Sequence, residues 1–201
     1  MVNIAVFVSG GGTNLQALID AQTSGRLHSG RIRLVLASNP GAYALERAKN
    51  AGIPGVVCSR KELGSQGGFE AAISKELEAH GIELIVLAGF MSILSENFTK
   101  QWPERIINVH PSLIPSFCGK GFYGLKVHEA ALSYGVKVTG ATVHFVNEIP
   151  DGGRIIAQKA VEILPGDTPE VLQKRVMEQA EWVLLPHAVE QVAAQMEKER
   201  A

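Results

Sequence analysis

The sequence predicts an α/β fold, with an open sheet that is mostly parallel, an antiparallel C-terminal part, and helices on both faces. Short β-rich runs alternate with helical patterns over the first 110 residues. This alternation is typical of parallel strands joined by right-handed crossover helices. After about residue 136 two extended segments follow one another across a turn, which favours an antiparallel hairpin.

The elements of this Rossmann-like arrangement are predicted from local patterns. Apolar, β-branched runs indicate strands, and apolar residues at helical spacing before a glycine indicate helices. Glu83–Ala88 has the unbroken hydrophobicity of a strand buried on both faces. The predicted strands are Asn3–Val8, Ile32–Ala37, Gly55–Cys58, Glu83–Ala88 and Ile106–Val109, and the predicted helices are Thr13–Ser24, Tyr43–Asn50 and Phe69–Ala79.

The back part of the chain predicts a hairpin and a long helix. Lys137–Asn147 alternates apolar and polar residues, Arg154–Leu164 is also extended, and the turn residues Pro150-Asp151-Gly152-Gly153 separate them. Thr168–Lys198 has a helical pattern, and Pro186 inside it predicts a kink or a break.

Length and composition limit the class of protein. The chain has 201 residues, 46% of them hydrophobic and 19% charged, which excludes intrinsic disorder. The length and the lack of a linker predict a single domain, 1–201. A net charge of −1 disfavours a basic nucleic-acid-binding domain. Two cysteines, Cys58 and Cys118, cannot form a disulfide framework and favour a reducing compartment.

No segment reads as a membrane span or a secretion signal. The longest apolar run, Leu84–Met91, has 8 residues, whereas a membrane-spanning helix needs about 20. The apolar N-terminal run has no Lys or Arg before it and leads straight into a glycine-rich loop, so it is interpreted as a strand. We therefore expect a cytoplasmic protein.

A glycine-rich loop, Ser9-Gly10-Gly11-Gly12-Thr13-Asn14, follows the first predicted strand. Glycines let the backbone approach a ligand closely, and the free N–H groups of the next helix favour an anion. The loop therefore predicts a phosphate site. It is a poor dinucleotide fingerprint, because Leu15 replaces the third glycine and Ser38-Asn39 lacks an acidic residue. A tight turn without a ligand is the alternative.

A candidate catalytic group follows the fifth predicted strand. Asn108 and His110 are two residues apart on a strand, so their side chains project to the same side. A carboxamide and an imidazole together could hold an oxyanion and move a proton. Asp151, in the turn of the hairpin, would stabilise the imidazolium if the fold brought it to His110. Otherwise His110 could be an ordinary loop residue and Asp151 the polar corner of a turn.

Other candidates are weaker on the sequence alone. His144 lies in the alternating segment and is interpreted as a packed, structural histidine, and Cys118 as a loop thiol. The remaining histidines lack the spacing of metal ligands, so no metal site is predicted. These are His28, His80, His128 and His187.

Together these motifs resemble the phosphoribosylglycinamide formyltransferases, a family of the folate-dependent formyltransferase superfamily. Nearly the whole chain takes part in the resemblance, and the Asn-x-His-Pro-Ser-Leu-x-Pro block with a downstream Asp-Gly-Gly is its most specific part. The motifs are Ser9-Gly10-Gly11-Gly12-Thr13-Asn14-Leu15, Leu87-Ala88-Gly89-Phe90-Met91, Asn108-Val109-His110-Pro111-Ser112-Leu113-Ile114-Pro115, Thr142-Val143-His144-Phe145-Val146 and Asp151-Gly152-Gly153.

The resemblance implies transfer of the formyl group of 10-formyltetrahydrofolate to the amine of N1-(5-phospho-D-ribosyl)glycinamide, in de novo purine (IMP) biosynthesis. It implies small-molecule partners, no metal, no nucleic acid, no membrane, and a monomer or homodimer. An N-terminal half of about 1–100 would bind the phosphate, and a C-terminal half of about 101–201 would bind folate and carry the chemistry. A formyltransferase for another amine, such as a sugar nucleotide, and a non-catalytic phosphate-binding module are the alternatives.

The resemblance also implies residue roles. The catalytic residues would be Asn108, His110 and Asp151. The ribonucleotide would be held by Gly11, Gly12, Thr13, Asn14 and Glu181. The folate co-substrate would be held by Phe90, Met91, Ser92, Ile93, Leu94, Asn108, Asn147, Glu148, Ile149, Pro150 and Asp151.

Four departures from the family pattern stand out in this sequence. Ser92 and Gln66 stand at or near positions where family members carry arginines. The segment Ser116–Gly124 is longer than in the shortest members, so the loop over the site could close differently. One extra residue precedes Glu181.

Overall fold

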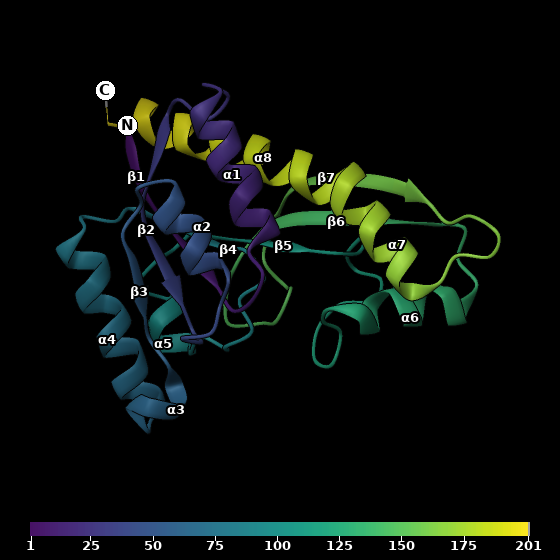
Figure 1. Cartoon of the computed structure of the whole chain (residues 1–201), viewed down its shortest axis with the longest axis horizontal. Coiled ribbons are helices and arrows are strands. Elements are labelled where there is room, and N and C mark those ends of the chain that lie inside the picture. The colour runs from purple at the N-terminus through teal and green to yellow at the C-terminus, as the bar shows by residue number, and fades with distance from the viewer. Residues whose placement is uncertain (201) are drawn as a thin grey trace.

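The structure is a computed structural model that describes residues 1–200 (Figure 1). Its centre is one seven-stranded sheet of order β3-β2-β1-β4-β5-β6-β7. The first five strands pair in parallel, and the last two join antiparallel, so the predicted fold class is confirmed. The strands are β1 (Val2–Val8), β2 (Gly30–Ala37), β3 (Gly55–Val57), β4 (Leu84–Leu87), β5 (Ile106–His110), β6 (Val138–Phe145) and β7 (Ile155–Glu162).

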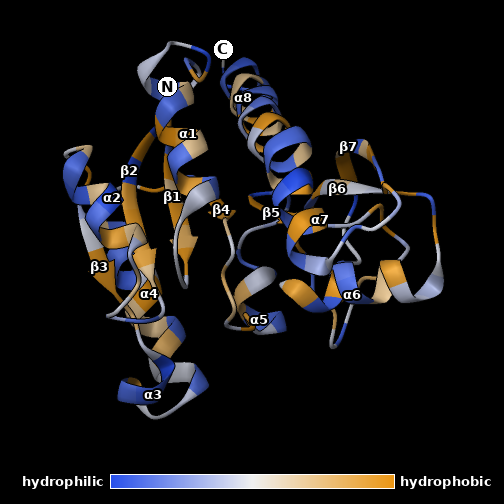
Figure 2. Ribbon diagram, turned by 45° about the vertical axis from the view of Figure 1, so that its right-hand side comes forward, coloured by the Kyte–Doolittle hydropathy of each residue, from blue (hydrophilic) through white to orange (hydrophobic). Residues whose placement is uncertain are grey.

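Helices cover both faces of the sheet. The helices α1 (Thr13–Thr23), α2 (Ala44–Asn50), α7 (Pro169–Val176) and α8 (Trp182–Lys198) share one apolar cluster with one face. The helices α4 (Gln66–Ala79) and α5 (Glu96–Thr99) pack on the other face. Two further helices are α3 (Arg60–Leu63) and α6 (Leu125–Tyr134), the latter packed against α7. Apolar strands lie between helices whose outer surfaces are polar (Figure 2).

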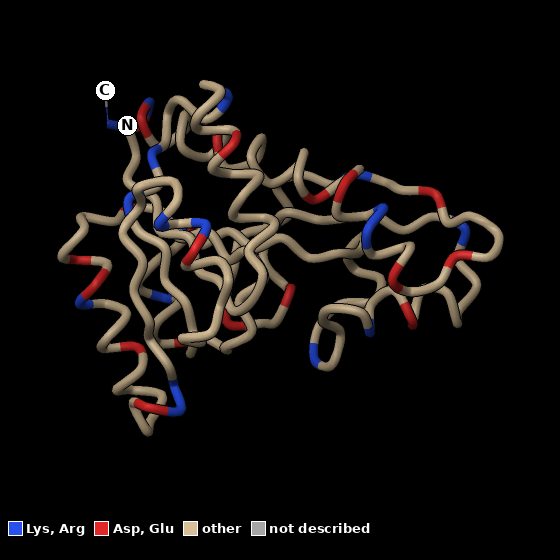
Figure 3. The backbone as a smooth tube through the Cα atoms, in the orientation of Figure 1, with Lys and Arg blue, Asp and Glu red and all other residues tan. Residues whose placement is uncertain are grey.

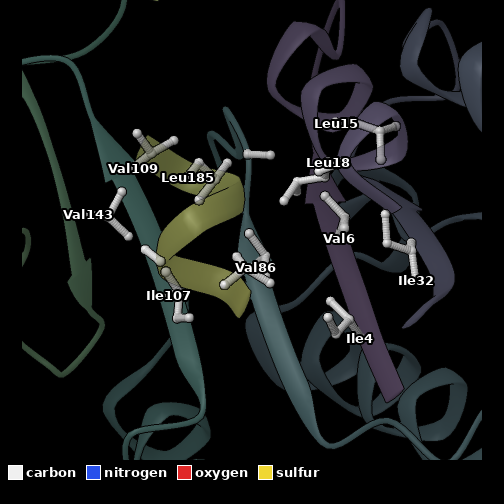
Figure 4. Packing of buried hydrophobic residues seen from close by; sticks show 14 of the residues in the cluster. Ile4, Val6, Leu15, Leu18, Ile32, Val86, Ile107, Val109, Val143 and Leu185 are labelled. Carbon is white, nitrogen blue, oxygen red and sulfur yellow. The ribbon is translucent and has the colours of Figure 1, made fainter. Parts of the chain in front are cut away.

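The strands alternate their side chains between the two apolar clusters. In β1, Ile4 and Val6 face the cluster that includes Leu18, whereas Ala5 and Phe7 face the cluster on the α4 side (Figure 4). Each fully buried aliphatic or aromatic side chain contributes about 1.5–3 kcal/mol relative to leaving it exposed. Burial on both faces fixes the strands, and the strands fix the loops that leave their carboxyl ends.

The topology places three of those loops at one edge. β1 lies between β2 and β4, so the strand order reverses there. Open α/β sheets bind ligands at such a switch point, outside the carboxyl ends of the strands. The loops after β1, β4 and β5 all leave at this edge, because these strands are parallel neighbours.

The C-terminal helical segment differs from the prediction. The helix continues through Pro186, and the irregularity falls before it, as a π-helical turn at Met177–Glu181 (η1) between α7 and α8. Pro186 has no N–H to donate to the carbonyl of Trp182, but it lies in the first turns of α8, where the helix continues past it. The helices α3, α5 and α6 were not predicted from the sequence.

The distribution of charged residues is consistent with the small net charge of the chain. Acidic and basic positions are dispersed along both halves of the chain (Figure 3). Within residues 1–200, no helix combines the length and the apolar character that crossing a membrane requires.

Candidate active site

The glycine loop between β1 and α1 is built from backbone. Gly12 has φ +72° and lies at the N-cap of α1. A Cβ there would lie 2.6 Å from the Cβ of Ala44, so both the conformation and the space require glycine. No side chain caps α1, which leaves its first N–H groups free to bind an anion.

Asn14 and Glu181 meet beside this loop, although they lie far apart in the sequence. The Asn14 Nδ2 donates to Glu181 Oε2 at 2.7 Å, and only 7% of Glu181 is exposed. Burial raises the pKa of Glu181, and the hydrogen bond from Asn14 partly offsets this effect. Within residues 1–200, Asn14 Oδ1 and Trp182 Nε1 are buried without a hydrogen-bond partner.

Glu181 is the last residue of the π-helical turn Met177–Glu181, directly before α8. A π-helical turn is wider than an α-helical turn, and such turns are frequent at functional sites. From this position Glu181 faces Asn14.

A second group of side chains lies on β5 and β6. Asn108 and His110 share one side of β5, whereas Ile107 and Val109 belong to the cluster on the opposite face. The antiparallel register places His144 of β6 opposite Asn108, and the Asn108 Nδ2 lies 3.2 Å from His144 Nε2.

Asp151 reaches this group from the hairpin loop. Its Oδ2 lies 3.6 Å from His110 Nδ1, and its Oδ1 lies 3.6 Å from His144 Nε2. Its φ of +55° is a left-handed conformation, which Asp and Asn adopt more readily than most residues. Burial by itself raises the pKa of Asp151, but hydrogen bonding to His144 and the charge of His110 hold the pKa below its ordinary value.

The loop Ser116–Gly124 closes over the same group through its backbone. His110 Nε2 donates to the carbonyl of Phe117 at 2.9 Å, and the N–H of Gly119 donates to Asp151 Oδ2 at 2.8 Å. Both ring nitrogens of His110 thus face oxygen acceptors, and the doubly protonated ring can donate to both.

The segment after β4 lies between the two groups. Ser9 Oγ accepts the N–H of Met91 at 2.8 Å, which ties this segment to the glycine loop. Met91 and Ile93 are 54% and 72% exposed, whereas the ring of Phe90 packs edge-on against Phe7. An apolar surface is therefore offered mainly by Met91 and Ile93.

Gln66 and the hairpin loop flank this segment. Gln66 Nε2 donates to the carbonyl of Ile93 at 3.0 Å and to Glu70 Oε1 at 2.5 Å. Gln66 therefore links α4 to the segment after β4. On the other side, the N–H of Ile149 donates to Asn147 Oδ1 at 3.0 Å in the loop that carries Asp151.

His144 is the main site residue that sequence reasoning missed. The interpretation as a packed histidine is incomplete, because His144 is buried but also contacts Asn108 and Asp151. Strand parity was the available signal, because His144 and Thr142 share the side that faces β5's polar residues. Among residues 1–200, no cluster of three or more His, Cys, Asp or Glu side chains is arranged to hold a metal ion.

Several known proteins are similar to this chain over most of its length. Residues 2–189 match the family described as Formyl transferase. A phosphoribosylglycinamide formyltransferase of Haemophilus influenzae is 42% identical over 181 residues, which are 89% of this chain and 82% of that protein. The trifunctional purine biosynthetic protein adenosine-3 of Gallus gallus is 46% identical over 96% of this chain, but the chain spans only 18% of its length.

Solved structures show the same likeness. The crystal structure of glycinamide ribonucleotide transformylase 1 from Symbiobacterium toebii superposes with a TM-score of 0.90 at 40% identity, covering 97% of this chain and 89% of that one. Phosphoribosylglycinamide formyltransferase from Brucella melitensis gives a TM-score of 0.87 at 40% identity, with 96% of both chains covered. The chain therefore belongs to the formyl transferase family, within its group of phosphoribosylglycinamide formyltransferases.

Proposed function

We propose that this protein transfers the formyl group of 10-formyltetrahydrofolate to the amine of N1-(5-phospho-D-ribosyl)glycinamide, a step of de novo purine (IMP) biosynthesis. The observation that carries the proposal is the convergence of Asn108, His110 and Asp151 at a sheet edge that also presents a free helix N-terminus. Family membership supports the same reaction.

The reaction begins when the substrate amine attacks the formyl carbon. A C–N bond forms, the carbonyl electrons move to oxygen, and a tetrahedral intermediate results. The amide N–H of Asn108 and the protonated His110 stabilise the negative oxygen. Removing one such donor typically costs about 10²–10³ in rate. The carbonyl then re-forms, the bond to N10 breaks, the amine loses a proton, and N10 gains one.

Asp151 supports this step through its charge. Its carboxylate faces the rings of His110 and His144, and the N–H of Gly119 holds one of its oxygens. A fixed anion beside His110 favours the imidazolium form of the ring, whose positive charge stabilises the developing oxyanion.

The glycine loop holds the ribonucleotide in this proposal. The N–H groups of Gly11, Gly12 and Thr13 bind the phosphate, and Asn14 with Glu181 holds the rest of the ribonucleotide. Fixing the phosphate places the amine next to the formyl carbon and lowers the entropic part of the barrier.

The folate co-substrate lies between two walls. One wall is the segment after β4, residues 90–94, and the other is the loop of residues 147–151, with Asn108 between them. The exposed side chains of Met91, Ile93 and Ile149 offer apolar contacts to its rings. Ser92 and Gln66 offer no positive charge to its acidic tail.

The two halves act as one domain of residues 1–201 in this proposal, with the phosphate bound by about 1–100 and the chemistry carried by about 101–201. The partners are small molecules, without nucleic acid or membrane, and the protein works in the cytoplasm as a monomer or homodimer.

Steady-state transfer assays test the proposal. The purified protein is given 10-formyltetrahydrofolate with the glycinamide ribonucleotide or with an amino sugar nucleotide, and release of tetrahydrofolate is followed by absorbance. We expect transfer to the glycinamide ribonucleotide only. Transfer to the sugar nucleotide alone would identify a different formyltransferase, and binding without transfer would identify a phosphate-binding module.

A further inference from the structure

Arg47 contacts the glycine loop from the β2 side of β1, whereas the catalytic group lies on β5 and β6, on the other side of β1 in the sheet. It belongs to α2, whose first residues pack against the loop. We propose that Arg47 is a positioning residue that sets the N–H groups of the glycine loop toward the phosphate and supplies the positive charge that balances it. The inference rests on the proposed function, because it takes the ligand of the loop to be a phosphorylated amine.

Two hydrogen bonds fix the direction of the loop's carbonyl groups. The N–H of Ala44 donates to the carbonyl of Gly10 at 3.1 Å, and Arg47 Nε donates to the carbonyl of Gly11 at 2.8 Å. In a trans peptide the C=O and the next N–H point in opposite directions. Holding the Gly10 and Gly11 carbonyls toward α2 therefore turns the N–H groups of Gly11 and Gly12 toward the ligand side.

The charge of Arg47 has no counter-ion in the structure. No carboxylate of residues 1–200 lies within 4.0 Å of its guanidinium. Its other contacts are neutral: Nη1 donates to Gln16 Oε1 at 3.1 Å, and the guanidinium lies 5.1 Å from the centre of the Tyr43 ring. Asp20 is linked only indirectly, because it accepts from Gln16 Nε2 at 2.9 Å.

A half-buried cation behind a row of N–H groups favours an anion in front of them. The Tyr43 ring and Gln16 hold the guanidinium in place without neutralising it. A phosphate dianion supplies the missing opposite charge. Arg47 thus has two effects: its hydrogen bond orients the peptide groups of the loop, and its positive charge attracts the phosphate. Both effects act on binding of the ribonucleotide rather than of the formyl donor.

Substitution of Arg47 separates this role from a structural one. In Arg47→Met the aliphatic stem remains, but the charge and the hydrogen bond to Gly11 are lost. We expect the KM for the glycinamide ribonucleotide to rise about 10- to 100-fold, as for loss of a charge-assisted hydrogen bond. The KM for the formyl donor and kcat at saturation should stay within about twofold.

Two further variants separate the effect of the Arg47 charge from that of its hydrogen bond and control for loss of a nearby cation. Arg47→Lys keeps the charge without the fixed Nε donor and should recover part of the affinity. Lys49→Met removes a cation from the same helix whose side chain is 78% exposed, and it should leave every constant unchanged. If Arg47→Met fails to fold, Arg47→Lys carries the test alone, with a smaller rise expected in the KM for the ribonucleotide only.

The proposal fails if Arg47→Met leaves the ribonucleotide KM unchanged, or if it raises both KM values equally. Its failure is distinguishable from failure of the proposed function by a binding titration without turnover. Inorganic phosphate is titrated calorimetrically into the wild type and the Arg47 variants. Weaker phosphate binding in Arg47→Met would support the role of Arg47 even if the wild type transferred no formyl group, whereas equal binding would overturn it.

Discussion

The glycine loop and the catalytic group lie at the same edge of the sheet, but the loop acts through backbone groups and the catalytic group acts through side chains. The loop after β1 exposes backbone N–H groups and depends on the absence of a side chain at Gly12. The catalytic group depends on side chains that come from β5, β6 and the hairpin loop. The difference teaches that binding and chemistry can be altered separately, by backbone changes in one region and by charge changes in the other.

The two regions also differ in the direction in which the pKa of a buried carboxyl group is shifted. Asp151 faces two histidines and an N–H group, and its pKa is lowered although burial by itself raises it. Glu181 faces one amide, and its pKa is raised by burial. The same functional group is therefore stabilised as an anion in the catalytic region and disfavoured as an anion beside the phosphate loop.

Loss of the Asp151 charge is expected to have the largest effect. Asp151→Asn keeps the size of the side chain and tolerates the left-handed backbone, but it removes the anion that orients His110. We expect kcat to fall about 10²–10³-fold, with the ribonucleotide KM nearly unchanged. Steady-state kinetics checks this. An unchanged kcat with a shifted KM would contradict the assignment of chemistry to the catalytic group and of binding to the glycine loop.

A side chain in the glycine loop is expected to act on binding. In Gly12→Ala the new Cβ would meet Ala44, and the φ of +72° would be strained. We expect the KM for the ribonucleotide to rise about 10- to 100-fold and stability to fall by about 1–3 kcal/mol. Gly52→Ala is the matched control, because its φ of +66° imposes a similar strain outside the loop and nothing lies within 4 Å of its added Cβ. Equal loss of affinity for the formyl donor would indicate misfolding instead.

Removal of His144 is expected to have an intermediate effect on chemistry. His144→Asn removes a ring that contacts both Asn108 and Asp151, but leaves the contact between Asp151 and His110 in place. We expect kcat to fall about tenfold, which corresponds to roughly 1.4 kcal/mol. A fall as large as that of Asp151→Asn, measured in the same assay, would make His144 an equal member of the catalytic group.

The smallest expected effect is on stability and depends on pH. Because the pKa of Glu181 is raised in the folded state, its stabilising contribution is present below pH 4.5 and is lost as the pH rises through the folded pKa. Glu181→Gln should therefore have a higher Tm than the wild type at pH 8, with the difference vanishing near pH 4. Each kcal/mol corresponds to about 2–4 °C. Thermal unfolding at both pH values checks this.

The pH dependence of stability contributed by Asp151 has the opposite sign to that contributed by Glu181. Its lowered pKa contributes stability above pH 3.8 that is lost as the pH falls through the folded pKa. Asp151→Asn should thus be less stable than the wild type at pH 8, and the two should converge in acid.

Much of the fold could be predicted because its signals are local. The alternation of strands and helices and the turn residues before the last strand were sufficient for the sheet and its hairpin. The helix α6 was missed because only Val127, His128 and Ala131 are buried on it, which leaves a weak apolar stripe. The π turn was missed because the sequence pattern marks Pro186 as the irregular position, whereas the wider turn lies at Met177–Glu181.

The site was predicted unevenly for a similar reason. Asn108 and His110 follow from strand parity, and the glycine loop follows from its position between strand and helix. The meeting of Asp151 with His110 depends on how the hairpin loop folds back, which local patterns do not encode. The same holds for His144, whose partner on β5 is set by the register.

The most direct test follows the initial rate against ribonucleotide concentration, at saturating formyl donor, in Gly12→Ala and Asp151→Asn side by side. The account predicts that Gly12→Ala approaches the wild-type rate at high concentration, whereas Asp151→Asn stays far below it at every concentration. The reverse pattern, with the Asp151 defect overcome by substrate and the Gly12 defect persisting, would contradict the assignment of binding to one region and chemistry to the other.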